Sequence, residues 1–159
     1  MTSTLRLWRK LSARPLGTRL FSWAICLRAP YFRTIRPHIT EMRPGYCEVR
    51  APKRRRVHNH IGTFHAIAAC NLAEVAAGML MEASLPTSHR WIPMGMTVRY
   101  VAKAKTDLRG VAELELPELT AEPTEWVVPV RILDTAGEVV VSADITMRVS
   151  EHKKTKTAA

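Results

Sequence analysis

The pattern of apolar and polar positions divides the chain into a helical start, a strand pair, one long helix and a final run of strands. Residues 3–14 and 18–28 mix apolar and basic positions in the manner of short amphipathic helices. The segment Arg14-Pro15-Leu16-Gly17 separates them, because proline and glycine interrupt a helix. From Ile35 to Arg50 apolar and polar residues alternate, which predicts two strands joined by a hairpin at Arg43-Pro44-Gly45.

The long helix is predicted by about 20 residues that follow His65 without a proline and are rich in Ala, Leu, Met and Glu. It should end near Leu85-Pro86. Apolar residues with 3–4 spacing make one stripe that must face a sheet: Phe64, Ala68, Leu72, Val75 and Met79. A second face of the helix groups Glu74 with other residues and is expected to be open to a partner: Ile67, Cys70, Gly78 and Met81.

The last third of the chain predicts four strands, at residues 92–104, 110–116, 126–134 and 138–149, with a turn at Thr135-Ala136-Gly137 between the last two. Six strands and one central helix indicate an α+β fold. With 159 residues, 47% of them hydrophobic, the chain is long enough for one such domain. We therefore expect a helical extension at 1–28, one domain at 29–150 and a polar tail at 151–159.

The net charge of +10 is confined to the first third of the chain. Residues 1–56 hold 14 Lys/Arg against two acidic residues, whereas residues 57–159 hold 10 against 12. The first 40 residues have eight Lys/Arg and no acid, which fits either two basic helices beside the domain or a mitochondrial presequence. The three cysteines form no Cys-x-x-Cys pair, and no apolar run reaches ~18 residues. A cytoplasmic protein without a membrane span is expected, with mitochondria as the alternative.

One motif narrows the choice among α+β folds. Asn59-x-x-Gly62-x-x-His65, followed by Leu72-x-Glu74-x-Ala76, resembles the signature of phenylacetate-pathway-type hotdog acyl-CoA thioesterases, with every spacing preserved. The wider stretch from residue 54 to 100, including Arg90-Trp91-Ile92-Pro93 and Gly95-Met96-Thr97-Val98, is similar to the hotdog family named domain of unknown function 4442 (DUF4442). The resemblance implies a curved antiparallel sheet wrapped around the long helix.

The resemblance also implies a site for thioester hydrolysis. Glu74 would be the base or nucleophile, and the loop and helix start at Asn59, Gly62, His65 and Ala66 would polarise the carbonyl. Free amides at a helix N-terminus favour a developing oxyanion. The sequence departs from the signature in two ways: Ala66 and Ile67 replace paired glycines, and Glu74 replaces aspartate. The CoA moiety belongs to the substrate, so no separate cofactor is expected.

Glu74 follows His65 by nine residues, which is roughly 13 Å along one helix. One chain cannot bring both to the same carbonyl, so we expect a homodimer, either alone or paired into tetramers, with each site shared by two subunits. His65 has an alternative role, in which its ring satisfies a backbone group at the helix start.

The roles of several basic and histidine residues have more than one interpretation. The run Lys53-Arg54-Arg55-Arg56 either contacts the CoA phosphates, lies in solvent, or serves nucleic acid. His58 and His60 have no further ligand in register, so no metal site is expected. Three other functions remain: binding an acyl thioester without turnover, dehydration of hydroxyacyl-CoA, and a basic adaptor for nucleic acid or an anionic membrane surface.

Overall fold

The computed structural model describes residues 1–120 and 122–152, and it contains the predicted helices and strands. The helices are α1 (Ser3–Ser12), α2 (Gly17–Arg28) and α3 (Ala66–Ser84), with short 3-10 helices η1 (Pro30–Thr34) and η2 (Arg55–Val57). The strands are β1 (His38–Arg43), β2 (Tyr46–Ala51), β3 (His89–Tyr100), β4 (Leu108–Glu113), β5 (Thr124–Leu133) and β6 (Val139–Glu151). Most of the predicted polar tail lies outside the described residues.

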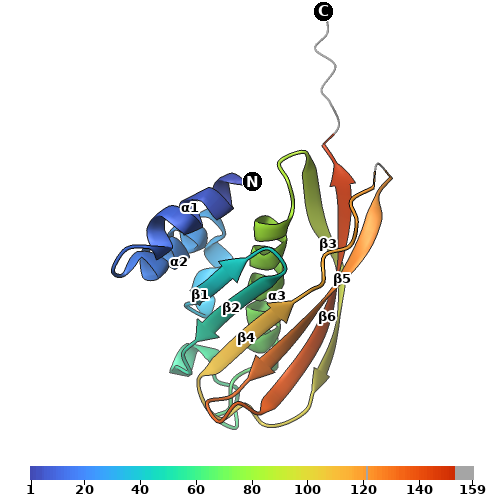
Figure 1. The fold of residues 1–159 in the computed structure, drawn as a ribbon. Coiled ribbons are helices and arrows are strands. Elements are labelled where there is room, and N and C mark those ends of the chain that lie inside the picture. The colour runs from blue at the N-terminus through green and yellow to red at the C-terminus, as the bar shows by residue number, and fades with distance from the viewer. Residues whose placement is uncertain (121, 153–159) are drawn as a thin grey trace, which may run out of the picture.

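The six strands form one antiparallel sheet in the order β1-β2-β4-β5-β6-β3, and the sheet curves around α3 (Figure 1). Its inner face is apolar because alternate residues of β5 and β6 point toward the helix and are buried, among them Val128, Val130, Ile132, Ala143, Ile145 and Met147. The last two strands are joined by the predicted turn, where Asp134 Oδ1 accepts from Ala136 and Glu138 N–H. Strands β1 and β3 are the two edges.

The predicted apolar stripe of α3 faces this sheet: Phe64, Leu72, Val75 and Met79 are buried, and Ala68 is half-buried. By length and composition α3 could span a bilayer, with mean hydropathy 1.4, but 67% of the 18-residue window is buried inside the protein. Its hydropathy therefore reflects its position in the core.

The second face of α3 differs from the expectation. Met81 is fully buried, and a Cβ on Gly78 would lie 3.1 Å from the indole of Trp91, because β3 crosses this part of the helix. Only the first half of that face stays accessible, at Ile67, Cys70 and Glu74. Strand β3 also ends at Tyr100, four residues before the predicted boundary, and Ala104 beyond it is buried against the start of the helix.

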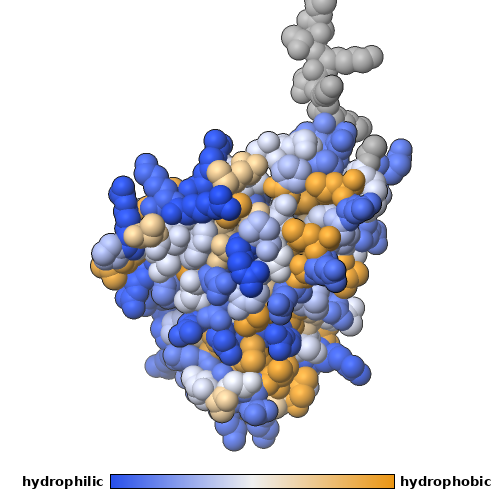
Figure 2. All heavy atoms as spheres, in the orientation of Figure 1, coloured by the Kyte–Doolittle hydropathy of each residue, from blue (hydrophilic) through white to orange (hydrophobic). Residues whose placement is uncertain are grey.

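The N-terminal helices pack on the β1 edge and share the main hydrophobic core through Leu5, Trp8, Phe21 and Ile25. Their outer surface mixes basic side chains with exposed apolar ones, among them Leu20, Trp23 and Leu27, and Figure 2 shows hydrophilic residues gathered over this part of the molecule. Buried Ser22 of α2 joins this layer to the sheet: its hydroxyl donates to Thr18 C=O at 2.7 Å and accepts from Ile39 N–H of β1 at 2.9 Å. The helix thereby satisfies an edge-strand amide that a neighbouring strand would otherwise bond.

Ser22→Ala should lower the free energy of unfolding by about 1–3 kcal/mol, because the buried Ile39 amide loses its acceptor. Ser3→Ala, which alters an exposed serine of α1, is the matched control and should change stability by less than about 0.5 kcal/mol. Urea unfolding curves measure both. Equal stabilities for the two variants would contradict the role of Ser22.

Candidate active site

The loop before α3 is ordered by the side chain of Asn59. Its Oδ1 accepts from the amides of Ile61 and Thr63 at 3.1 and 3.0 Å, and its Nδ2 donates to Thr63 Oγ1 at 2.7 Å. Gly62 has φ 75°, a left-handed conformation that disfavours any side chain, although a Cβ there would meet no neighbour. The two motif residues therefore fix the shape of the loop, and one N–H of the Asn59 amide remains for a ligand.

The loop leads into the N-terminus of α3. His65 is the N-cap, and its Nδ1 accepts from Ile67 N–H at 3.1 Å, so its ring satisfies a backbone group as the alternative interpretation anticipated. Within the described residues the Ala66 N–H meets no acceptor. Because Ala66 stands at the positive end of a 19-residue helix, this amide can donate to a carbonyl oxygen that gains negative charge.

Glu74 lies on the accessible face of α3, between Cys70 one turn before it and Gly78 one turn after it. It is half-buried and takes part in none of the ion pairs found among the described residues. Tyr100 of β3 borders the same face, with its hydroxyl 3.3 Å from Cys70 Sγ. That contact with Cys70, together with burial, raises the pKa of the Tyr100 phenol. No sequence pattern pointed to Tyr100, because only folding brings β3 beside Cys70.

The structure brings Asn59, Gly62, His65 and Ala66 together at one end of α3, whereas Glu74 lies about two and a half turns farther along the helix. Apolar side chains around this face are uncovered in the single chain: Ile67 is 57% exposed, and Ile92, Met94 and Tyr100 of the edge strand β3 are each more than half exposed. An unpaired edge beside exposed apolar residues is typical of a surface that another chain covers.

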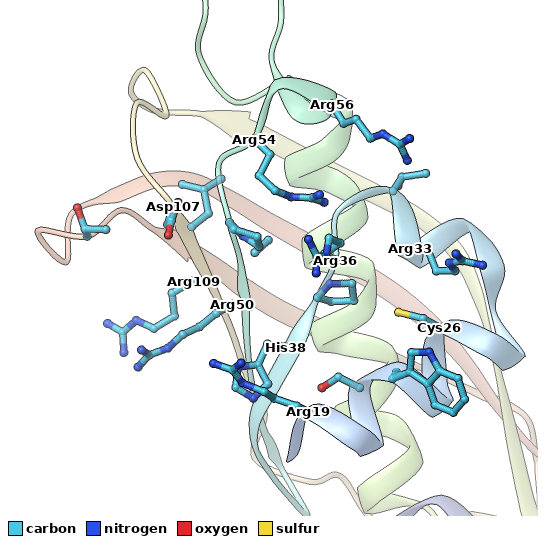
Figure 3. A pocket seen from close by; sticks show the side chains of 18 of the residues that line it. Arg19, Cys26, Arg33, Arg36, His38, Arg50, Arg54, Arg56, Asp107 and Arg109 are labelled. Atoms are coloured by element: carbon cyan, nitrogen blue, oxygen red, sulfur yellow. The ribbon is translucent and has the colours of Figure 1, made fainter. Parts of the chain in front are cut away.

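The four basic residues before the loop, Lys53 to Arg56, lie in different surroundings. Arg54 and Arg56 line a cleft of about 1520 Å³ beside η1, whereas Lys53 and Arg55 do not. The Lys53 backbone amide donates to Asp107 Oδ1 at 2.7 Å. The same cleft contains Arg33 and Arg36, which the sequence analysis did not single out (Figure 3). Two of the four predicted basic residues therefore face a cavity.

The histidines of the loop show no metal site. Over residues 1–120 and 122–152, no group of three His, Cys, Asp or Glu side chains converges in a geometry that could hold a metal ion. The backbone of His58 pairs with that of Phe64, and its buried Nε2 has no hydrogen-bond partner among the same residues.

Comparisons with known proteins bear on the family and the fold. The family model described as a domain of unknown function, DUF4442, matches residues 17–149. A crystal structure from a structural-genomics programme is 47% identical, covers 94% of this chain and 99% of its own, and has a TM-score of 0.83. A probable thioesterase from Pseudomonas aeruginosa is 25% identical, with coverages of 87% and 97% and a TM-score of 0.73.

A more distant thioesterase from Staphylococcus aureus, 16% identical, covers 76% of this chain and 98% of its own with a TM-score of 0.68, and shows the fold alone. No functionally curated protein matches. The predicted hotdog fold and the family resemblance are confirmed.

Asn59→Ala should release the loop, because Ile61 and Thr63 lose their side-chain acceptor. Hydrogen exchange at these two amides should become at least about tenfold faster, as expected for the loss of about 1.4 kcal/mol of local protection. Asn59→Asp keeps the acceptor oxygens and is the matched control. Unchanged exchange in Asn59→Ala would show that the loop is held by other contacts.

Proposed function

The chain belongs to the DUF4442 family of hotdog proteins, and from that premise we propose that it hydrolyses acyl-CoA thioesters to a free acid and CoA. The observation that carries the proposal is the pairing of two features of α3. Among the described residues, the amide at its N-terminus has no acceptor, and the half-buried carboxylate on its accessible face has no ion-pair partner. Hydrolysis of a thioester needs both kinds of group.

The chemistry follows from these two groups. The carbonyl oxygen of the thioester accepts a hydrogen bond from the Ala66 N–H, which stabilises the oxyanion as it forms. In one route Glu74 removes a proton from water, the hydroxide attacks the carbonyl carbon, the C–S bond breaks, and the leaving CoA thiolate takes up the proton. In the other route the Glu74 carboxylate attacks the carbonyl carbon, the C–S bond breaks and the CoA thiolate leaves. Water then hydrolyses the resulting anhydride, which releases the free acid, restores the Glu74 carboxylate and provides the proton that the thiolate takes up.

The site requires two subunits in this proposal. Glu74 and the Ala66 amide of one chain are roughly 12 Å apart along the helix axis, which is too far for both to reach one carbonyl. The exposed apolar residues of α3 and β3 give a second copy a surface to cover. A two-fold dimer through this surface would place Glu74 of one subunit beside the Asn59 loop and Ala66 of the other. Such dimers can in turn pair into tetramers.

The substrate is proposed to reach the site past Ile67. The replacement of the paired glycines of the signature by Ala66 and Ile67 adds side chains at the helix start, and Ile67 is 57% exposed there. These side chains narrow the space around the carbonyl. We therefore expect selectivity among acyl groups to depend on Ile67, while the hydrolytic groups stay the same.

Glu74→Gln should lower kcat at least about 100-fold, because the amide neither takes a proton nor attacks the carbonyl. Release of free thiol from a panel of acyl-CoA substrates measures the rate. Glu82→Gln is the matched control: Glu82 is also a half-buried glutamate of α3, but its Oε1 accepts from Trp91 Nε1 at 3.3 Å, away from the site. It should retain at least half of the activity.

Thermal melting of both variants separates loss of chemistry from loss of fold. Equal rates for wild type and Glu74→Gln would exclude Glu74 as the catalytic group. Stabilisation of the wild type by acyl-CoA without any thiol release would replace hydrolysis with ligand binding.

A further inference from the structure

The cleft beside η1 collects positive charge from segments far apart in the sequence. α2, η1, the residue before Pro37 and the connector after β2 all contribute arginines that form no ion pair among the described residues: Arg19, Arg33, Arg36, Arg54 and Arg56. Figure 3 shows Arg36 and Arg54 extending toward the same space in front of α3. Five unpaired guanidinium groups around one cavity repel one another unless an anion lies between them.

The acidic side chains around the cleft already have hydrogen-bond partners. Glu48 holds Arg50 at 3.3 Å and Arg109 at 3.1 Å on the far side of the cleft. Burial alone would raise the pKa of Glu48, but hydrogen bonds from Thr40, Arg109 and Arg50 lower it. Asp107 and Asp134 line the cleft and accept from backbone amides instead of arginines. The excess positive charge is therefore left for a ligand.

The excess of positive charge is seen most clearly in the contacts of Arg54. Its Nε and one terminal nitrogen are buried and have no hydrogen-bond partner in the part of the chain that the structure describes. Burial, followed by the charges of Arg36 and Arg56, lowers the pKa of its guanidinium. Arg36 adopts φ 49° directly before Pro37, a left-handed conformation that costs about 1 kcal/mol for a residue with a side chain. The strained backbone of Arg36, the repulsion between neighbouring arginines and the unpaired nitrogens of Arg54 therefore occur at the same place. Such a combination is typical of an anion-binding site.

A smaller pocket links this cleft to the α3 N-terminus. It has a volume of about 250 Å³, shares Thr34 and Arg56 with the cleft, and reaches His65 and Ile67. Asn71 in its wall is only 4% exposed. Its Nδ2 donates to Thr34 Oγ1 at 3.1 Å, but its Oδ1 meets no donor within residues 1–120 and 122–152. The pocket thus offers a buried amide oxygen to a donor on the way from the basic cleft to the Ala66 amide.

We propose that the cleft binds the phosphorylated nucleotide end of CoA, and that the pantetheine arm runs through the smaller pocket past Asn71 to the helix start. This inference rests on the proposed hydrolysis only for the position of the thioester. CoA carries a diphosphate and a 3′-phosphate, which match several arginines, and its arm carries amide N–H donors for Asn71. A hollow with buried Arg54 nitrogens fits compact phosphates better than the convex face of an acidic carrier protein.

The test compares Arg36→Gln/Arg54→Gln with a matched control, Arg6→Gln/Arg9→Gln, which removes the same charge from two exposed arginines of α1 outside the cleft. Calorimetric titration of the full chain with adenosine 3′,5′-bisphosphate, and with CoA, should show affinity reduced about 10- to 100-fold in the cleft variant and less than twofold in the control. Wild-type affinity should fall as salt is raised.

Kinetics provide the second readout. KM for an acyl-CoA should rise at least about tenfold in the cleft variant, whereas KM for the same acyl group on pantetheine, which lacks all three phosphates, should change less than twofold. Thermal melting confirms that the cleft variant is folded.

The outcomes separate this inference from the proposed function. Loss of nucleotide binding in the cleft variant, with no thiol release from any acyl-CoA by the wild type, supports the cleft and refutes hydrolysis. Thiol release with unchanged nucleotide affinity and KM in the cleft variant refutes the cleft alone. The cleft is also refuted if only an acyl carrier protein substrate, and not CoA or the bisphosphate, depends on Arg36 and Arg54.

Discussion

The packing of α3 against the sheet is the constraint on which the rest of the structure depends. Small residues let β3 and the inner face of the sheet approach the helix backbone, most closely where the indole of Trp91 lies against Gly78. The second face of the helix, which carries Glu74, is thereby enclosed in its C-terminal half and accessible at Ile67, Cys70 and Glu74. Glu82, the other carboxylate of the helix, is also half-buried but accepts a hydrogen bond from Trp91 Nε1, which leaves Glu74 as the carboxylate that can meet a ligand.

The same packing fixes what the N-terminus of α3 can do. The Asn59 side chain and the φ of Gly62 set the path of the loop, and His65 caps the Ile67 amide, so the Ala66 amide is the first-turn donor nearest to the loop. The N-terminal helical segment forms one wall of the arginine-lined cleft. Ser22 binds α2 to the β1 edge, and α2 and η1 then bring Arg19 and Arg33 to the cleft that the connector arginines face.

The fold was predictable from the sequence because its signals are local. Proline and glycine mark the ends of α1 and α2, alternation marks β5 and β6, and the spacing of Asn59, Gly62, His65 and Glu74 marks the candidate site. The accessible part of the second face of α3 was predicted to be longer than it is, because no local sequence pattern indicates that Trp91 packs on Gly78. Arg36, Asn71 and Tyr100 were missed for the same reason: each gains its surroundings only from segments distant in the chain.

The central claim is that one active site is built from two chains, and subunit complementation tests it most directly. Glu74→Gln subunits and Asn59→Ala subunits, each inactive alone, are mixed, exchanged and assayed for thiol release from an acyl-CoA. A shared site predicts that activity returns to about one quarter of the wild-type rate, because half of the dimers are mixed and each mixed dimer regains one of its two sites. No recovery, with subunit exchange verified by mass spectrometry, would contradict a site shared between subunits.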